Sequence, residues 1–75
     1  MRGYVVLFEG DDETGYSAYA PDLPGVAAAA DTRQETEDLM REAMAGHLAL
    51  LHEMGHPVPE PAEATGVMIL DPAAA

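Results

Sequence analysis

The 75-residue sequence contains no cysteine, no tryptophan and no lysine, and three arginines are its only strongly basic residues. Without cysteine the chain has neither disulfides nor thiolate metal ligands, which fits a reducing compartment. One domain of this length buries only about 60% of its unfolded surface, so self-association is the most accessible source of further stability. We therefore expect a single domain that forms a homo-oligomer, either a dimer or a tetramer.

Basic charge is scarce, whereas fourteen aspartates and glutamates give the chain a formal net charge of −11. Direct binding to nucleic acid is not expected, because phosphate contacts need a basic surface. A basic protein would suit this surface, since complementary fields speed encounter and exclude wrong partners. Solubility alone is the competing explanation of the acidity.

Long apolar runs are also absent. The apolar stretch at residues 4–8 is too short for the core of a signal peptide or for a membrane span. We therefore expect a cytoplasmic protein without membrane contact.

Strands are predicted at residues 4–9 and 16–20, which are rich in β-branched and aromatic residues and flank a polar, glycine-bounded loop. Pro21 and Pro24 end the second strand in a stiff turn. Residues 26–30 are a valine and four alanines, and alanine prefers helix. Because a helix-start signal follows at once, we predict a short third strand there.

A long helix is predicted over residues 32–54. Thr32 and Glu35 have the spacing of a capping box, with Asp31 and Gln34 as the alternative one residue earlier. Gly55 supplies the stop signal.

The predicted fold class is α+β, in the order β-β-β-α-β. A proline-rich connector at residues 56–62 leads to a last strand at residues 66–70. The elements form a small antiparallel sheet with one long helix on one face. Residues 1–70 are expected to form the single domain, and residues 71–75 a frayed tail.

The pattern leaves apolar surface without a cover inside one chain. The apolar arc of the helix spans about 180°, whereas a single core-facing stripe needs a little over 100°. The first strand is apolar on both faces, and one helix covers only one of them. We expect an oligomer interface formed by Val5, Leu7, Met44, His47, Leu48 and Leu51, and a partner-binding surface formed by Asp11, Asp12, Glu13, Asp22 and Leu23.

No catalytic constellation is recognisable. Ser17 has no His/Asp relay in the sequence, and the acids of the hairpin tip are not held across a cleft. His52 and His56 have a spacing that binds zinc on a helix, but Gly55 ends the helix between them. We expect no enzyme activity, no metal site and no cofactor.

A family resemblance covers about Tyr4 to Leu70. The sequence resembles the HicB-like antitoxins in the run Tyr19–Val26, then in Asp31–Glu35, Ala43, Leu48–Leu51, Glu53–Gly55 and Pro57–Pro61. The resemblance implies a partial ribonuclease-H-like fold without ribonuclease activity. It also implies a partner, HicA, a small basic toxin that cleaves RNA. Full HicB antitoxins usually add a C-terminal DNA-binding domain, and the sequence shows no counterpart, so a stand-alone member without self-repression is expected.

Three functions remain open at this point. The first is a non-enzymatic interaction module that neutralises a basic, RNA-targeting toxin. The second is an oligomeric scaffold or ligand-binding protein that shares the fold but has no toxin. The third is an enzyme with residual nuclease-like chemistry, which would need divalent metal bound by the carboxylates.

Overall fold

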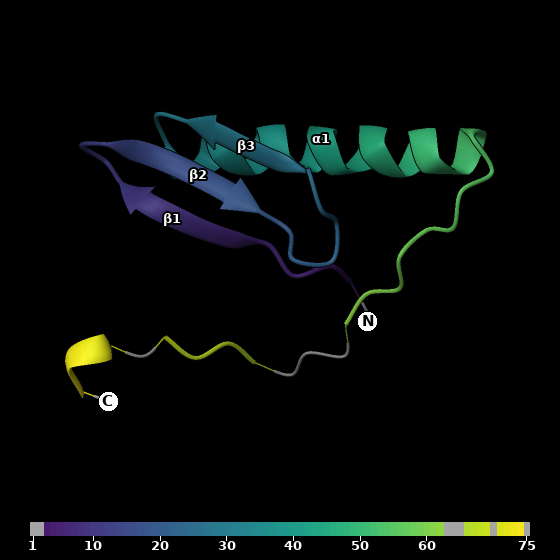
Figure 1. The fold of residues 1–75 in the computed structure, drawn as a ribbon. Coiled ribbons are helices and arrows are strands. Elements are labelled where there is room, and N and C mark those ends of the chain that lie inside the picture. The colour runs from purple at the N-terminus through teal and green to yellow at the C-terminus, as the bar shows by residue number, and fades with distance from the viewer. Residues whose placement is uncertain (1–2, 63–65, 70, 75) are drawn as a thin grey trace.

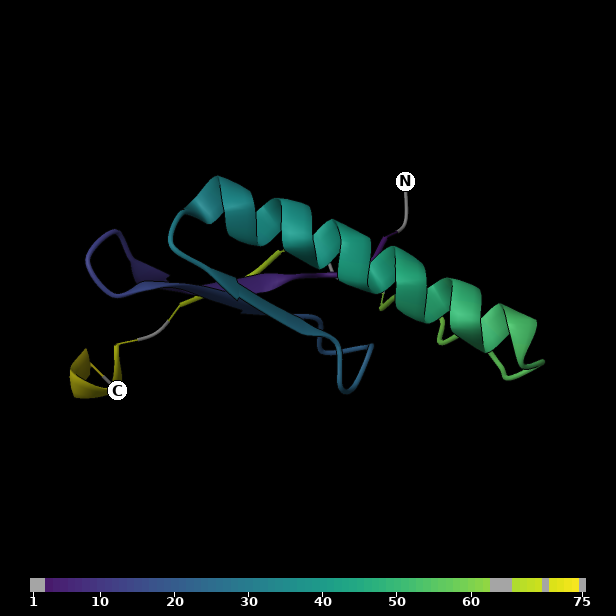
Figure 2. The same cartoon turned by 90° about the horizontal axis from the view of Figure 1, so that it is seen from above.

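A computed structural model describes residues 3–62, 66–69 and 71–74 and shows a two-layer α+β arrangement (Figure 1). Its elements are strands β1 (Leu7–Asp11), β2 (Gly15–Tyr19) and β3 (Ala27–Ala30), helix α1 (Arg33–Glu53) and a short 3-10 turn, η1 (Pro72–Ala74). The strands form an antiparallel sheet in the order β1-β2-β3, and α1 covers one face of it (Figure 2). The predicted α+β fold class is confirmed. No helix within the described residues is long and apolar enough to span a membrane.

The first two strands form a tighter hairpin than the sequence predicts. β1 begins at Leu7, which pairs with Tyr19, and ends at Asp11, which pairs with Gly15. Tyr19 is the last residue of β2, and the turn that starts at Pro21 leaves no partner for the residues before Leu7. The ladder is therefore displaced toward the hairpin tip relative to the predicted strand at residues 4–9.

β3 consists entirely of alanine, and its prediction as a strand is confirmed. Ala28 pairs with the buried Ala18, and both belong to the layer that packs under α1. Their small side chains allow the helix to lie close to the sheet, and α1 contacts β2 and β3.

The predicted last strand at residues 66–70 is wrong for the part that the structure describes. Gly66–Ile69 has no strand structure, and in Figure 1 this stretch runs past β1 without joining the sheet. Val67, Met68 and Ile69 are 65%, 85% and 95% exposed. Val67 and Ile69 are β-branched, which favours a strand only where a neighbouring strand and a packed face are present, and here neither is. Leu70 lies outside the described residues.

Both ends of α1 follow the signals in the sequence. The Thr32 hydroxyl oxygen accepts the Glu35 N–H at 3.1 Å and donates to the Glu35 carboxylate. At the other end Gly55 has φ +71, its N–H donates to the His52 carbonyl, and His56 donates to the Leu51 carbonyl. This pair of bonds is a Schellman motif.

The core is small and lies under the N-terminal half of α1. It consists of Ala18, Ala20, Leu23, Val26 and Met40, together with Thr36, whose hydroxyl donates to the Thr32 carbonyl at 2.7 Å. α1 has 21 residues and is about 31 Å long, whereas a five-residue strand spans about 17 Å. The C-terminal half of α1 therefore extends past the sheet, as Figures 1 and 2 show.

Candidate functional site

Carboxylates gather at one end of the molecule. The hairpin tip and the junction between β3 and α1 lie at the same end, because Tyr16 at the start of β2 pairs with Ala30 at the end of β3. We call this region the acidic end; it consists of Glu9, Asp11, Asp12, Glu13, Asp31 and Glu35, all of them exposed. Their summed field attracts cations over a longer range than any single carboxylate.

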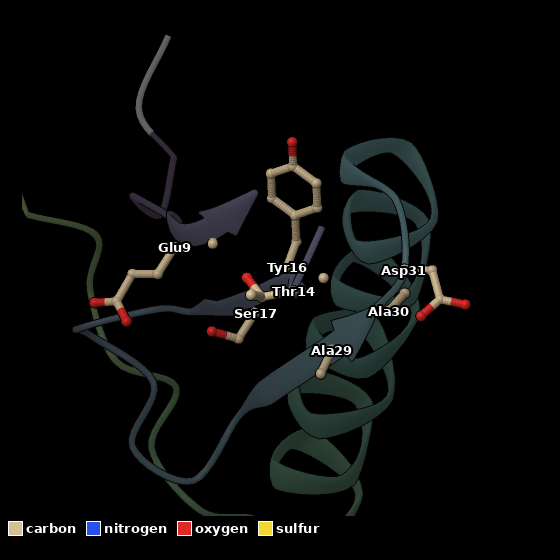
Figure 3. A pocket seen from close by; sticks show the side chains of 9 residues that line it. Glu9, Thr14, Tyr16, Ser17, Ala29, Ala30 and Asp31 are labelled. Carbon is tan, nitrogen blue, oxygen red and sulfur yellow. The ribbon is translucent and has the colours of Figure 1, made fainter. Parts of the chain in front are cut away.

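A shallow hollow of about 630 Å³ lies within the acidic end. Figure 3 shows the side chains around it: Glu9, Ser17 and Ala29 come from three neighbouring strands, and Asp31 follows β3. In the strand register Glu9 pairs with Ser17, and Ser17 pairs with Ala29 on its other side. Small side chains and the backbone of Gly10 and Gly15 form much of the lining. We call this hollow the acidic trough.

The acidic trough can accept cationic N–H donors, such as a lysine or arginine side chain of a partner. Single exposed ion pairs contribute little, about 0–1 kcal/mol each. Binding here would therefore depend on several pairs and on shape. Sequence reasoning misses Glu9 and Asp31 as site residues, although strand alternation places Glu9 on the same face as Asp11.

Two of the predicted partner-binding acids also stabilise the hairpin tip. One Asp11 carboxylate oxygen accepts the Glu13 N–H at 3.0 Å, the Thr14 N–H at 2.8 Å and the Thr14 hydroxyl at 2.9 Å. The Thr14 hydrogen bonds lower the pKa of Asp11, with a smaller contribution from Glu13. Asp12 accepts the Tyr16 hydroxyl at 2.8 Å, and this bond raises the pKa of Tyr16.

The turn formed by Asp11 predicts a pH dependence. Its pKa is lowered in the folded state, so its contribution to stability is present above the unfolded pKa of about 3.9 and is lost as the pH falls through the folded pKa. Between about pH 5 and pH 2, urea unfolding should show a larger fall in stability for the wild type than for Asp11→Asn. Glu13→Gln, at the same tip, is the control, and its stability should fall over this pH range as that of the wild type does. If the free energy of unfolding fell equally with pH for Asp11→Asn and for the wild type, this role of Asp11 would be contradicted.

Of the other three predicted partner-binding residues, Glu13 is exposed at the hairpin tip, whereas Asp22 and Leu23 have contacts inside the chain. Asp22 is half-buried and accepts the Ala62 N–H at 2.9 Å, which ties the connector to the turn. Leu23 is 0% exposed and belongs to the core. In this structure its side chain is not available to a partner.

The predicted oligomer interface is divided between two surfaces. Met44 and Leu48 pack against the core and line an apolar groove of about 430 Å³ together with Tyr4, Val6 and Phe8. Leu7 alternates with Phe8 and so lies on the sheet face away from α1. The remaining residues of the set are half-buried: Val5, His47 and Leu51.

Glu37 pairs with both arginines that the structure describes. Its carboxylate lies 3.0 Å from Arg33 and 2.7 Å from Arg41, and the hydrogen bonds from Arg41 and then Arg33 lower its pKa. Arg33 also lies 3.4 Å from the centre of the Phe8 ring. These two positive charges are thus already engaged along α1.

No metal-binding group of three or more His, Cys, Asp or Glu side chains occurs among residues 3–62, 66–69 and 71–74. Within the same residues, every buried side-chain nitrogen or oxygen atom has a hydrogen-bond partner.

The fold and its surface define a small, acidic α+β domain with one long helix on a three-stranded sheet. The family model described as the HicB-like antitoxin of bacterial toxin–antitoxin systems matches residues 4–72. The chain therefore belongs to the HicB-like antitoxin family, and the resemblance seen in the sequence is confirmed. A comparison with curated proteins finds no match.

Proposed function

We propose that the protein is an antitoxin that binds and neutralises a small, basic, RNA-targeting toxin of the HicA type, and that it does so in the cytoplasm and without catalysis. Family membership across residues 4–72 supports the antitoxin role. The acidic end is the reason for proposing a basic partner, because it concentrates carboxylates on one exposed surface. Charge complementarity of this kind steers encounter and fixes the orientation of the complex.

The proposed mechanism is competition with RNA. A protein that cleaves RNA needs cationic groups for the phosphate backbone. The carboxylates of the acidic end would take the place of those phosphates, with the acidic trough receiving one basic side chain. The toxin surface is then covered, and RNA is excluded without any change to the toxin itself.

Inhibition of RNA cleavage tests this function. The protein is titrated into a small basic HicA-type ribonuclease, and cleavage of a fluorescent RNA is followed. We expect stoichiometric inhibition that weakens as salt rises. Glu9→Gln combined with Asp31→Asn should weaken binding by about 10- to 100-fold, since truncating close interfacial charges costs a few kcal/mol.

A charge-matched control separates the acidic end from net charge. Asp38→Asn combined with Glu53→Gln removes the same charge from exposed positions on α1 and should leave inhibition nearly unchanged. Equal weakening by both double variants would mean that only net charge matters. Absence of inhibition by the wild type would refute the antitoxin proposal for this partner.

A second candidate is an oligomeric protein of the same fold with no toxin partner. Exposed apolar side chains on α1, among them Leu39, Leu50 and Met54, favour it. This candidate predicts self-association together with no inhibition in the same assay.

A further inference from the structure

The sheet face opposite α1 is open among the residues that the structure describes (Figure 2). Strand alternation turns Phe8, Ala18 and Ala28 toward the helix, where they belong to the core or pack against it. Their neighbours along each strand point the other way. We call the surface that these neighbours form the open sheet face; it consists of Leu7, Glu9, Ser17, Tyr19, Ala27 and Ala29.

Two rows of side chains cross the open sheet face. In the first, the apolar row, Tyr19 pairs with Leu7 on one side and with Ala27 on the other. The second, the acidic row, lies two residues away along each strand; it contains Glu9 and belongs to the acidic trough. The two rows are about 7 Å apart, because a strand rises about 3.4 Å per residue. The surface therefore changes from apolar to acidic over a short, fixed distance.

The shape of the open sheet face suits a helix. Ala27, Ala29 and Ser17 have small side chains and are exposed, so the face is shallow on the β2 and β3 side and an element can lie flat on it. An apolar sheet face is commonly covered by a helix, as α1 covers the other face. Helix residues three or four apart have Cβ atoms about 5–6 Å apart, which is close to the distance between the two rows. A helix with an apolar and a basic residue one turn apart therefore matches both rows.

Charge selects a basic protein as the source of that helix and disfavours a second copy of the chain. The sequence of α1 contains five acids and two arginines, and both arginines are already paired with Glu37. A second α1 on the open sheet face would place further carboxylates against Glu9, and like charges across an interface are costly. Nucleic acid is disfavoured for the same reason.

We propose that the open sheet face docks one basic, amphipathic helix of the toxin, an assignment that rests on the antitoxin function proposed above. An apolar side chain of that helix packs on Tyr19 and Leu7, and a lysine or arginine one turn further along reaches Glu9. The complex then has three layers, with the toxin helix and α1 on opposite faces of the sheet. Tyr19 is the specificity-determining residue, because it requires an apolar group at a fixed distance from a positive charge, which attraction by net charge does not.

Truncation of Tyr19 tests this assignment in the ribonuclease inhibition assay. Tyr19→Ala should weaken binding of the HicA-type ribonuclease by about 10- to 30-fold, the loss expected of a central aromatic anchor. Tyr19→Phe keeps the ring and should inhibit as the wild type does. Leu39→Ala is the matched control, because Leu39 is 45% exposed and Tyr19 is 43% exposed, but Leu39 lies on α1; it should leave binding unchanged. Circular dichroism checks that each variant is folded.

Synthetic peptides test the open sheet face without the toxin. Two peptides of about 18 residues, long enough to form a helix, have the same numbers of leucine, lysine and alanine. In the first, each leucine has a lysine four residues later on the same side; in the second, leucine and lysine lie on opposite sides. In a nuclear magnetic resonance titration, the first peptide should shift the amides of Leu7, Ser17 and Tyr19. It should also bind at least about 10-fold more tightly than the second.

The two experiments separate failure of the docking surface from failure of the proposed function. Inhibition that is unchanged in Tyr19→Ala would overturn the docking surface and leave the antitoxin function standing. Equal binding of both peptides, no binding of either, or shifts confined to α1 would overturn it as well. A wild type that does not inhibit the ribonuclease but binds the first peptide at the open sheet face would refute the antitoxin function for that toxin and support the face as a site for basic helices.

Discussion

Replacing Leu23 by alanine is expected to lower the free energy of unfolding by about 2–5 kcal/mol, the range for large-to-small changes in a core. Leu23 is fully buried among Ala18, Ala20, Val26 and Met40. Its backbone is also fixed, because its N–H donates to the Ala20 carbonyl at 3.0 Å and its carbonyl accepts the Val26 N–H at 3.2 Å. The site therefore cannot collapse easily around a smaller side chain.

The total stability of a domain this small is about 5 kcal/mol or little more, so Leu23→Ala should be largely unfolded at room temperature or unfold at much lower urea concentration. Urea titration followed by circular dichroism measures the effect. Leu39→Ala is the control in dilute solution, because Leu39 is 45% exposed and its truncation removes little buried surface. Similar midpoints for the two variants would contradict the central position of Leu23 in the core.

Gly10→Ala is expected to destabilise the protein by more than about 2 kcal/mol. Gly10 has φ +113, and a Cβ there would overlap the backbone carbonyl oxygen of Gly15. Because Gly10 pairs with Tyr16 in the ladder, the hairpin would have to open or shift to make room. The variant should also lose the arrangement of Glu9 and Asp11 at the acidic end.

Gly25→Ala separates strain from overlap. Gly25 has φ +85, but a Cβ there would meet nothing within 4 Å, so the alanine adds only the strain of the left-handed backbone, about 1–2 kcal/mol. In thermal unfolding, the melting temperature of Gly10→Ala should therefore lie well below that of Gly25→Ala. Hydrogen exchange at Tyr16 should speed up only in Gly10→Ala. An equal loss of stability in the two variants would show that overlap of the added Cβ at Gly10 has no effect.

The helix and the third strand could be predicted because their signals are local. Thr32, Glu35 and Gly55 supply hydrogen bonds within one helical turn, and the predicted helix differs from the observed one by a residue at each end. The alanine strand was predicted because the cap at Thr32 leaves no room for a helix before it. The capping signal outweighs the intrinsic preference of alanine.

The remaining features depend on which segments meet. A strand at residues 66–70 needs a partner edge, and composition alone does not supply one. Leu23 lies between two prolines and has the appearance of a surface turn, yet the turn folds back into the core. Glu9 and Asp31 line the same trough only through the register of three strands.

The connector after α1 returns to the beginning of the chain. The Tyr4 hydroxyl donates to the Pro59 carbonyl, and Asp22 accepts the Ala62 N–H. Pairings of β1 with β2, of β2 with β3 and of β3 with α1 join neighbours in sequence, so their loops close quickly. The connector contacts join residues 55 and 40 positions apart and carry the larger loop-closure entropy. We therefore expect the strands and helix to assemble first and the connector to dock last, and to be the first part to open in local unfolding.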